Sequence, residues 1–170
     1  MMKYCIECGA LLTERYLKNE GEIPYCPRCQ VFRFPVFNTA VSMVVKSPDQ
    51  EKILLIQQYG KKKYILVAGY VNQGESAEHA VAREVKEELG LNVVSYAFNR
   101  SEYFAPSNTL MLNFNCTVDS EDLSGMTDEV DTALWMTRDE IIDGLENGMV
   151  MGSLAEKFLK LYLADEKAKR

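Results

Sequence analysis

A cluster of glutamates beside an arginine has the residue types and the spacing to hold a metal ion. Within the segment GYVNQGESAEHAVAREVKEELGL, the cluster comprises Glu75, Arg83, Glu84, Glu87 and Glu88. Carboxylates three and four residues apart on one helix raise one another's pKa values unless a positive charge neutralises them. Hard divalent cations such as Mg²⁺ prefer oxygen ligands and bind through a few carboxylates together with substrate phosphates. The cluster therefore indicates divalent-metal chemistry on a phosphate compound, with an exposed helix of ion pairs as the alternative.

Helical geometry places three of these carboxylates on one side of the predicted helix. At about 100° per residue, Glu84, Glu87 and Glu88 fall within an arc of roughly 100°. Lys86 and His79 lie opposite, toward water. The adjoining arc carries apolar residues that would face a core, namely Val81, Ala82, Val85 and Leu89. Carboxylates beside the buried face favour a binding site over a solvated surface.

A second set of candidate metal ligands lies near the start of the sequence. Cys5, Cys8, Cys26 and Cys29 form two C-x2-C pairs separated by 17 residues, and Cys116 stands apart. This spacing is typical of a four-cysteine zinc ribbon, in which each pair presents two thiolates to one ion. Four thiolates leave no open coordination position, so we expect a structural Zn²⁺, with a disulfide framework as the alternative. We expect Cys116 to be a buried thiol of a strand.

The elements that must position these residues divide the chain into two parts. We expect a zinc ribbon over residues 1–34, with little core of its own, and a larger domain over residues 35–170. The predicted strands cover 36–45, 52–58, 64–71, 91–98, 109–118 and 133–136, with a hairpin turn at GKKK. The predicted helices cover 75–90, 137–148 and 153–170. Ser76 is expected to cap the first of these helices.

Composition limits the class of protein. The chain has 170 residues, 47% hydrophobic and 26% charged, as in ordinary globular domains. No apolar run reaches the roughly 20 residues of a membrane span, and the start MMKYCIECGA resembles no secretory signal, so we expect a cytoplasmic protein. A net charge of −6 disfavours a broad nucleic-acid footprint but not a small anionic substrate held by metal ions.

The glutamate cluster is part of a longer motif. Gly69, five residues, Glu75, seven residues, and then the run from Arg83 to Gly90 resemble the Nudix box at every fixed position. The resemblance to Nudix hydrolases implies an α/β/α sandwich with a mixed sheet, in which the box forms a loop, a helix and a loop. It also implies cleavage of a nucleoside diphosphate linked to another group, with Mg²⁺ or Mn²⁺ as the cofactor.

The resemblance also implies roles for single residues. The expected metal ligands are Glu84, Glu87 and Glu88. Glu75 would lie near the metals or pair with Arg83, and these two join the ligands as candidate catalytic residues. Gly69 would let the backbone approach the helix closely, and Gly90 would end that helix. The resemblance does not indicate which glutamate takes a proton from the attacking water.

Features outside the box resemble one branch of the family, the NADH pyrophosphatases with a zinc ribbon. Glu129, followed by VDTALW, is similar to that branch's further metal ligand, with a plain acidic loop as the alternative. The final GSLAEKFL is similar to its last helix, and the branch implies a homodimer. Where the branch has SQPWPFPxS, this chain has SEYFAPSNT, so the exact substrate stays open. Tyr103 and Phe104 in that stretch could stack on a base or belong to the core.

Three functions compete at this stage. The first is a pyrophosphohydrolase of a small nucleotide, such as an NAD(H)-like dinucleotide, ADP-ribose or a related compound. The second is decapping of NAD-type RNA ends, which shares the chemistry but is disfavoured by the acidic charge. The third is a Nudix ligand sensor without catalysis, which is disfavoured because the chain keeps the whole box. Metal-dependent release of phosphate products separates the third from the other two.

Overall fold

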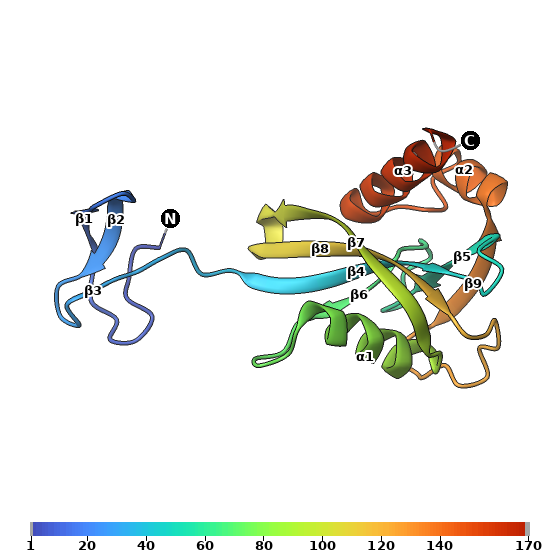
Figure 1. Ribbon diagram of the computed structural model, residues 1–170, viewed down its shortest axis with the longest axis horizontal. Coiled ribbons are helices and arrows are strands. Elements are labelled where there is room, and N and C mark those ends of the chain that lie inside the picture. The colour runs from blue at the N-terminus through green and yellow to red at the C-terminus, as the bar shows by residue number, and fades with distance from the viewer. Residues whose placement is uncertain (1, 169–170) are drawn as a thin grey trace. The chain divides into compact units, whose positions relative to one another are not determined.

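The computed structural model describes residues 2–168 (Figure 1). The chain folds into two compact units, Met1–Phe37 and Asn38–Arg170, and each is described by itself. Of the helices within residues 2–168, none has the length and apolar character required to cross a membrane.

The N-terminal unit is a small three-stranded sheet. Strands β1 (Thr13–Leu17), β2 (Gly21–Cys26) and β3 (Val31–Phe32) pair antiparallel in that order. Among the described residues of this unit, only Cys5 and Cys26 are buried. The unit therefore lacks an apolar core, as a domain stabilised by a metal ion would.

The C-terminal unit is built on a mixed six-stranded sheet. Its strands are β4 (Asn38–Lys46), β5 (Lys52–Gln57), β6 (Val67–Tyr70), β7 (Val93–Phe104), β8 (Thr109–Val118) and β9 (Thr132–Thr137). The order is β7-β8-β4-β5-β9, and β6 pairs with β4 beside this path. Strands β4 and β8 run parallel, whereas the other pairs are antiparallel. The predicted mixed sheet is therefore confirmed.

Helices cover both faces of this sheet (Figure 1). Helix α1 (Ala77–Leu89) packs on one face, while α2 (Arg138–Glu146) and α3 (Ser153–Ala168) pack on the other. Alternate strand residues serve the two cores, because successive side chains point to opposite faces. Leu54 of β5 joins the core beneath α1, and its neighbour Leu55 joins the core beneath α2 and α3. The predicted α/β/α sandwich is confirmed.

Some predicted boundaries differ from the structure. Strand β7 continues to Phe104, and it is followed by a 3₁₀ turn, η1 (Ala105–Ser107). The GKKK turn does not join a regular hairpin. Strand β6 pairs with β4, and β5 pairs with the segment before β6 through an isolated bridge between Ile56 and Ile65. Ala82, expected in the core, is exposed, since the buried stripe of α1 instead includes Ala80.

Helix α1 has defined ends, which fix its glutamates relative to the sheet. The Ser76 side chain accepts a hydrogen bond from the His79 N–H at 3.2 Å, as an N-cap does. Gly90 ends the helix in the left-handed conformation with φ 73°, and its N–H donates to the Lys86 carbonyl. The apolar side of the helix rests on the sheet through Val81 and Val85.

Candidate active site

Arg83 is the positive charge around which the glutamates gather. Its Nε and Nη2 donate to the two carboxylate oxygens of Glu75 at 2.8 and 3.0 Å. Its Nη1 donates to Glu84 at 2.7 Å and to Glu87 at 2.8 Å, and Nη2 also reaches the Tyr70 carbonyl. The guanidinium therefore neutralises part of the crowded negative charge. The sequence alone did not indicate whether Glu75 pairs with Arg83 or lies near the metal ions.

The pKa values of the cluster separate according to surroundings. Hydrogen bonding to Arg83 lowers the pKa of Glu75 to about 2, so this carboxylate stays ionised. Burial raises the pKa of Glu84 against the opposing effect of Arg83. Burial also raises the pKa of Glu88 to about 7, and the charges of Glu84 and Glu129 add to this rise. A nearby cation would favour the ionised form of Glu88.

Glu88 is the most enclosed carboxylate of the cluster, with 4% of its surface exposed. Its Oε1 accepts a hydrogen bond from Nε2 of Gln58 at 3.0 Å, while its Oε2 has no hydrogen-bond partner among the described residues. A buried carboxylate oxygen without a partner is costly in a folded protein. The oxygen therefore fits a cation as its missing partner.

A cavity of about 450 Å³ brings several predicted site residues together. Its lining includes Gly69, Arg83, Glu84, Glu88, Phe104 and Glu129. Apolar side chains such as Met111 and Leu154 share the wall with these charged groups. A cavity with apolar walls and a few convergent polar groups is the usual form of a small-molecule site.

Gly69 lies directly against the carboxylate of Glu84. A Cβ atom added at this glycine would collide with the Glu84 carboxylate, so no other residue fits without moving it. Glu84 and Glu88 offer only oxygen ligands on adjacent turns of α1. The donor set, the close approach of Gly69 and the Oε2 of Glu88, which lacks a partner in the part of the chain that the structure describes, together fit a hard divalent cation.

The loop between β8 and β9 brings Glu129 to this cavity. Thr127 in this loop donates from its N–H to the Glu88 carbonyl at 3.1 Å and from its hydroxyl to the Glu87 carbonyl at 3.0 Å. Gly90 packs against Gly125 so closely that an added Cβ would lie 2.6 Å from the Gly125 carbonyl oxygen. The end of helix α1 thus holds the loop that supplies the fourth predicted metal ligand, Glu129.

Other predicted residues lie outside the described lining of the cavity. Glu75 faces Arg83, and Glu87 has a side chain 55% exposed that pairs with the same arginine. Tyr103 is exposed and donates its hydroxyl to the side chain of Asn108 at 2.8 Å. Of the two aromatic residues singled out in the sequence, Phe104 is therefore the one that faces the cavity.

Two further aromatic residues line the cavity and were missed from the sequence. Tyr59 is 83% exposed, adopts a positive φ of 59° and precedes Gly60 in a turn. Tyr70 directly follows Gly69 and is also exposed. The left-handed conformation of Tyr59 could not be predicted, because the position carries neither a glycine nor an asparagine. For Tyr70, its position beside Gly69 of the box could have indicated that it lies at the site.

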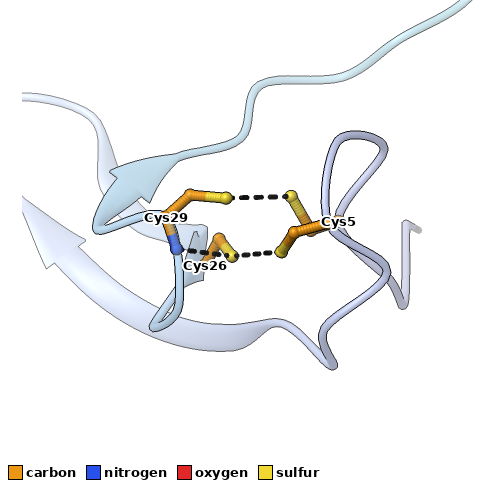
Figure 2. Close-up of side chains that lie close together, drawn as sticks. Cys5, Cys26 and Cys29 are labelled. Atoms are coloured by element: carbon orange, nitrogen blue, oxygen red, sulfur yellow. Dashed lines mark hydrogen bonds between the residues drawn. The ribbon is translucent and has the colours of Figure 1, made fainter.

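The four cysteine sulfurs of the N-terminal unit meet at one point, three of them labelled in Figure 2. Sγ of Cys5 lies 4.0 Å from that of Cys29, and Sγ of Cys8 lies 3.5 Å from that of Cys26. A tetrahedral zinc with Zn–S bonds of about 2.3 Å holds its sulfurs about 3.8 Å apart. All four are free thiols, so the disulfide alternative does not apply and the cluster fits one zinc ion.

The pKa values of two thiols in this cluster shift in opposite directions. Burial acts to raise the pKa of Cys5, but hydrogen bonds from the backbone of Cys8 and Glu7 and from the side chains of Cys26 and Cys8 together lower it to about 6. Hydrogen bonding to Cys8 raises the pKa of Cys29 to about 12. Zinc binds thiolates, so its binding would release protons from this cluster and weaken in acid.

The comparison with known families defines the class of protein. The NUDIX domain family matches residues 36–154, which cover the sheet, helix α1 and the cavity. The chain therefore belongs to the Nudix family.

Sequence similarity to NAD-capped RNA hydrolases extends over nearly the whole chain. The NAD-capped RNA hydrolase NudC of Pseudomonas aeruginosa is 27% identical over 162 residues, which are 95% of this chain and 56% of that protein. The NAD-capped RNA hydrolase ndx-9 of Caenorhabditis elegans is 29% identical over 92% of this chain and 41% of its own. The chain thus spans about half the length of the curated relatives it matches.

Solved structures share the fold. A NUDIX hydrolase from Nitrosomonas europaea has a TM-score of 0.67 at 18% identity and covers 98% of this chain and 93% of that chain. A structure described as an ADP compounds hydrolase has a TM-score of 0.64 at 22% identity, with 93% and 84% covered. At these identities the likeness bears on the fold alone.

Proposed function

We propose that this chain is a metal-dependent pyrophosphohydrolase that cleaves the diphosphate of a nucleoside diphosphate linked to another moiety. The observation that carries the proposal is the cavity lined by Glu84, Glu88 and Glu129, with one oxygen of Glu88 buried and without a hydrogen-bond partner within residues 2–168. Such an oxygen set suits Mg²⁺ or Mn²⁺, which bind carboxylates and substrate phosphates together. Membership of the Nudix family supports the same reaction class.

The residues in and beside the cavity would have different roles in this reaction. Glu84, Glu88 and Glu129 would hold the divalent cation, with Glu87 as a further ligand. When bound, the cation neutralises phosphate charge and lowers the pKa of a coordinated water. A glutamate of this group would take a proton from the water that attacks one phosphorus in line, while the bond from that phosphorus to the bridging oxygen breaks and the other phosphate leaves with this oxygen. Arg83 holds Glu84 and Glu87 in position through its Nη1.

We further propose that the substrate is an NAD-like dinucleotide or ADP-ribose. The names of the relatives support a substrate with an NAD group. Three aromatic side chains line the cavity, namely Tyr59, Tyr70 and Phe104. Aromatic rings stack on a base or a nicotinamide without requiring one particular ring. The four-cysteine unit, which would hold a structural zinc, supports the NADH pyrophosphatase branch.

The test is a screen of the purified chain, with Mg²⁺ or Mn²⁺, against NADH, NAD, ADP-ribose, FAD, CoA and diadenosine polyphosphates. We expect mononucleotide products from NAD-like substrates, identified by mass, and no products without a divalent cation. Glu88→Gln should lower the rate by at least about 100-fold, since removal of a metal ligand removes its charge. Hydrolysis by Glu88→Gln at the wild-type rate would refute the proposed role of this residue.

Decapping of NAD-capped RNA is the second candidate, and the relatives' names favour it. The net charge of −6 weighs against a long RNA footprint. Competition between NAD and an NAD-capped RNA of about 20 nucleotides decides between the two. A much higher kcat/KM for the RNA would make decapping the main activity.

The resemblance to the NADH pyrophosphatase branch also leads us to propose a homodimer. Light scattering of the same sample would test this oligomeric state.

A further inference from the structure

Gln58 forms a buried pair with Glu88. Gln58 is 7% exposed and Glu88 is 4% exposed, and the amide Nε2 of Gln58 donates to Glu88 Oε1 at 3.0 Å. A hydrogen bond from a neutral donor to an ionised acceptor is among the stronger kinds, and burial strengthens it further. Gln58 does not belong to the Nudix box, and it comes from a different element of the fold.

The backbone on both sides holds Gln58 in place. It directly follows β5, whose last residue, Gln57, pairs with Thr132 of β9. Its carbonyl accepts a hydrogen bond from the Lys61 N–H, which closes the turn after the strand. The amide is therefore presented to helix α1 from a strand end and a closed turn rather than from a free loop.

The contact makes the two oxygens of Glu88 unequal. Oε1 is occupied by the amide, whereas Oε2 is buried and has no hydrogen-bond partner in the described chain. A carboxylate on a flexible side chain could otherwise rotate or offer both oxygens to an ion. With the amide in place, the side chain keeps one orientation, and Oε2 is the oxygen left for another ligand. Glu88 and Glu84 both line the cavity.

We propose that Gln58 is a positioning residue for the divalent cation, which holds Oε1 of Glu88 and leaves Oε2 as its one ligand atom. The inference deepens the proposed function and rests on it for the nature of the ion. Loss of a hydrogen-bonding partner behind a metal ligand commonly costs 10- to 100-fold in metal affinity. The opposing possibility is that Gln58 only fills space between β5 and α1.

The test compares Gln58→Met with the matched control Gln57→Met. Methionine has a similar length and no N–H donor, so it preserves packing better than a truncation. Gln57 is the adjacent residue, and its side chain donates to the Lys62 carbonyl away from the glutamates. The probe is Mn²⁺ alone, and binding is followed by the paramagnetic resonance signal of the free ion, without substrate.

We expect Gln58→Met to bind Mn²⁺ about 10-fold more weakly and Gln57→Met to bind it as the wild type does. In a Glu88→Gln background, adding Gln58→Met should cause no further loss, because the amide acts through that carboxylate. Wild-type Mn²⁺ affinity in Gln58→Met, or an equal loss in both backgrounds, would overturn the inference.

A second variant covers the case in which Gln58→Met does not fold. Gln58→Asn keeps the amide but shortens the side chain by roughly 1.5 Å, which takes the amide nitrogen out of hydrogen-bond range of Glu88. It should weaken Mn²⁺ binding to a similar degree, and unchanged affinity would overturn the inference. A wild-type chain that binds Mn²⁺ but hydrolyses neither NAD-like dinucleotides, ADP-ribose nor any other compound of the screen would instead refute the proposed function.

Discussion

Replacement of Glu88 by glutamine should stabilise the protein at alkaline pH when no divalent cation is present. The carboxyl group is buried beside Glu84 and Glu129, and burial raises its pKa from 4.5 to about 7. Glutamine keeps the shape of the side chain and the acceptor for the Gln58 amide, but it never ionises. The variant therefore removes an ionisation that the fold opposes.

The size and the pH range of this effect follow from linkage. A carboxyl group whose pKa is higher in the folded state contributes stability that is complete below the unfolded value and is lost as pH rises through the folded value. A rise from 4.5 to about 7 in the pKa of Glu88 corresponds to a loss of about 3 kcal/mol. Glu88→Gln should thus exceed the wild type by about 3 kcal/mol at pH 8 and by less than about 1 kcal/mol at pH 5.

The assay is urea unfolding followed by the fluorescence of Trp135, the single tryptophan, in metal-depleted buffer with zinc retained. Trp135 lies in β9, so the signal reports on the C-terminal unit. Glu87→Gln is the control, because Glu87 is exposed and paired with Arg83 and should give no such gain. Equal stability of Glu88→Gln and the wild type at pH 8 would refute the reasoning, as would a gain that is larger at pH 5.

Three other perturbations should have separable effects. Gly69→Ala should lower Mn²⁺ affinity and activity by at least about 10-fold, measured by titration, because its Cβ would displace the Glu84 carboxylate. Unchanged affinity would show that the close approach does not matter. Phe104→Ala should raise KM about 10-fold by removing a ring of the cavity, whereas Tyr103→Ala should leave KM within about twofold, and the reverse order would contradict the site. Cys26→Ser should abolish the bound zinc, seen by elemental analysis, without shifting the Trp135 transition; zinc retained at one ion per chain would contradict the ribbon.

Local features of the site could be predicted because they are encoded by neighbouring residues. Helix α1, its cap at Ser76 and its left-handed end at Gly90 depend on residues within a few positions of one another. The spacing of the four cysteines likewise predicted that their side chains lie close together. These features could be predicted without knowing how distant segments of the chain pack together.

Contacts between distant segments could not be predicted in the same way. Gln58 and Glu88 are 30 positions apart, and nothing in either residue type indicates the buried hydrogen bond between them. The helical wheel placed Ala82 in the core, but the position of the sheet leaves it exposed. The exposed Tyr59 at the cavity depends on a turn closed by the Lys61 N–H rather than on its own residue type.

The most direct test of the account is a crystal structure with Mn²⁺ and an uncleavable dinucleotide, with the ion located by its anomalous scattering. The account predicts an anomalous peak within about 2.5 Å of Glu88 Oε2 and of a Glu84 oxygen, with the diphosphate bound to the same ion. A peak at other residues, or a diphosphate bound without any ion near Glu84 and Glu88, would contradict it.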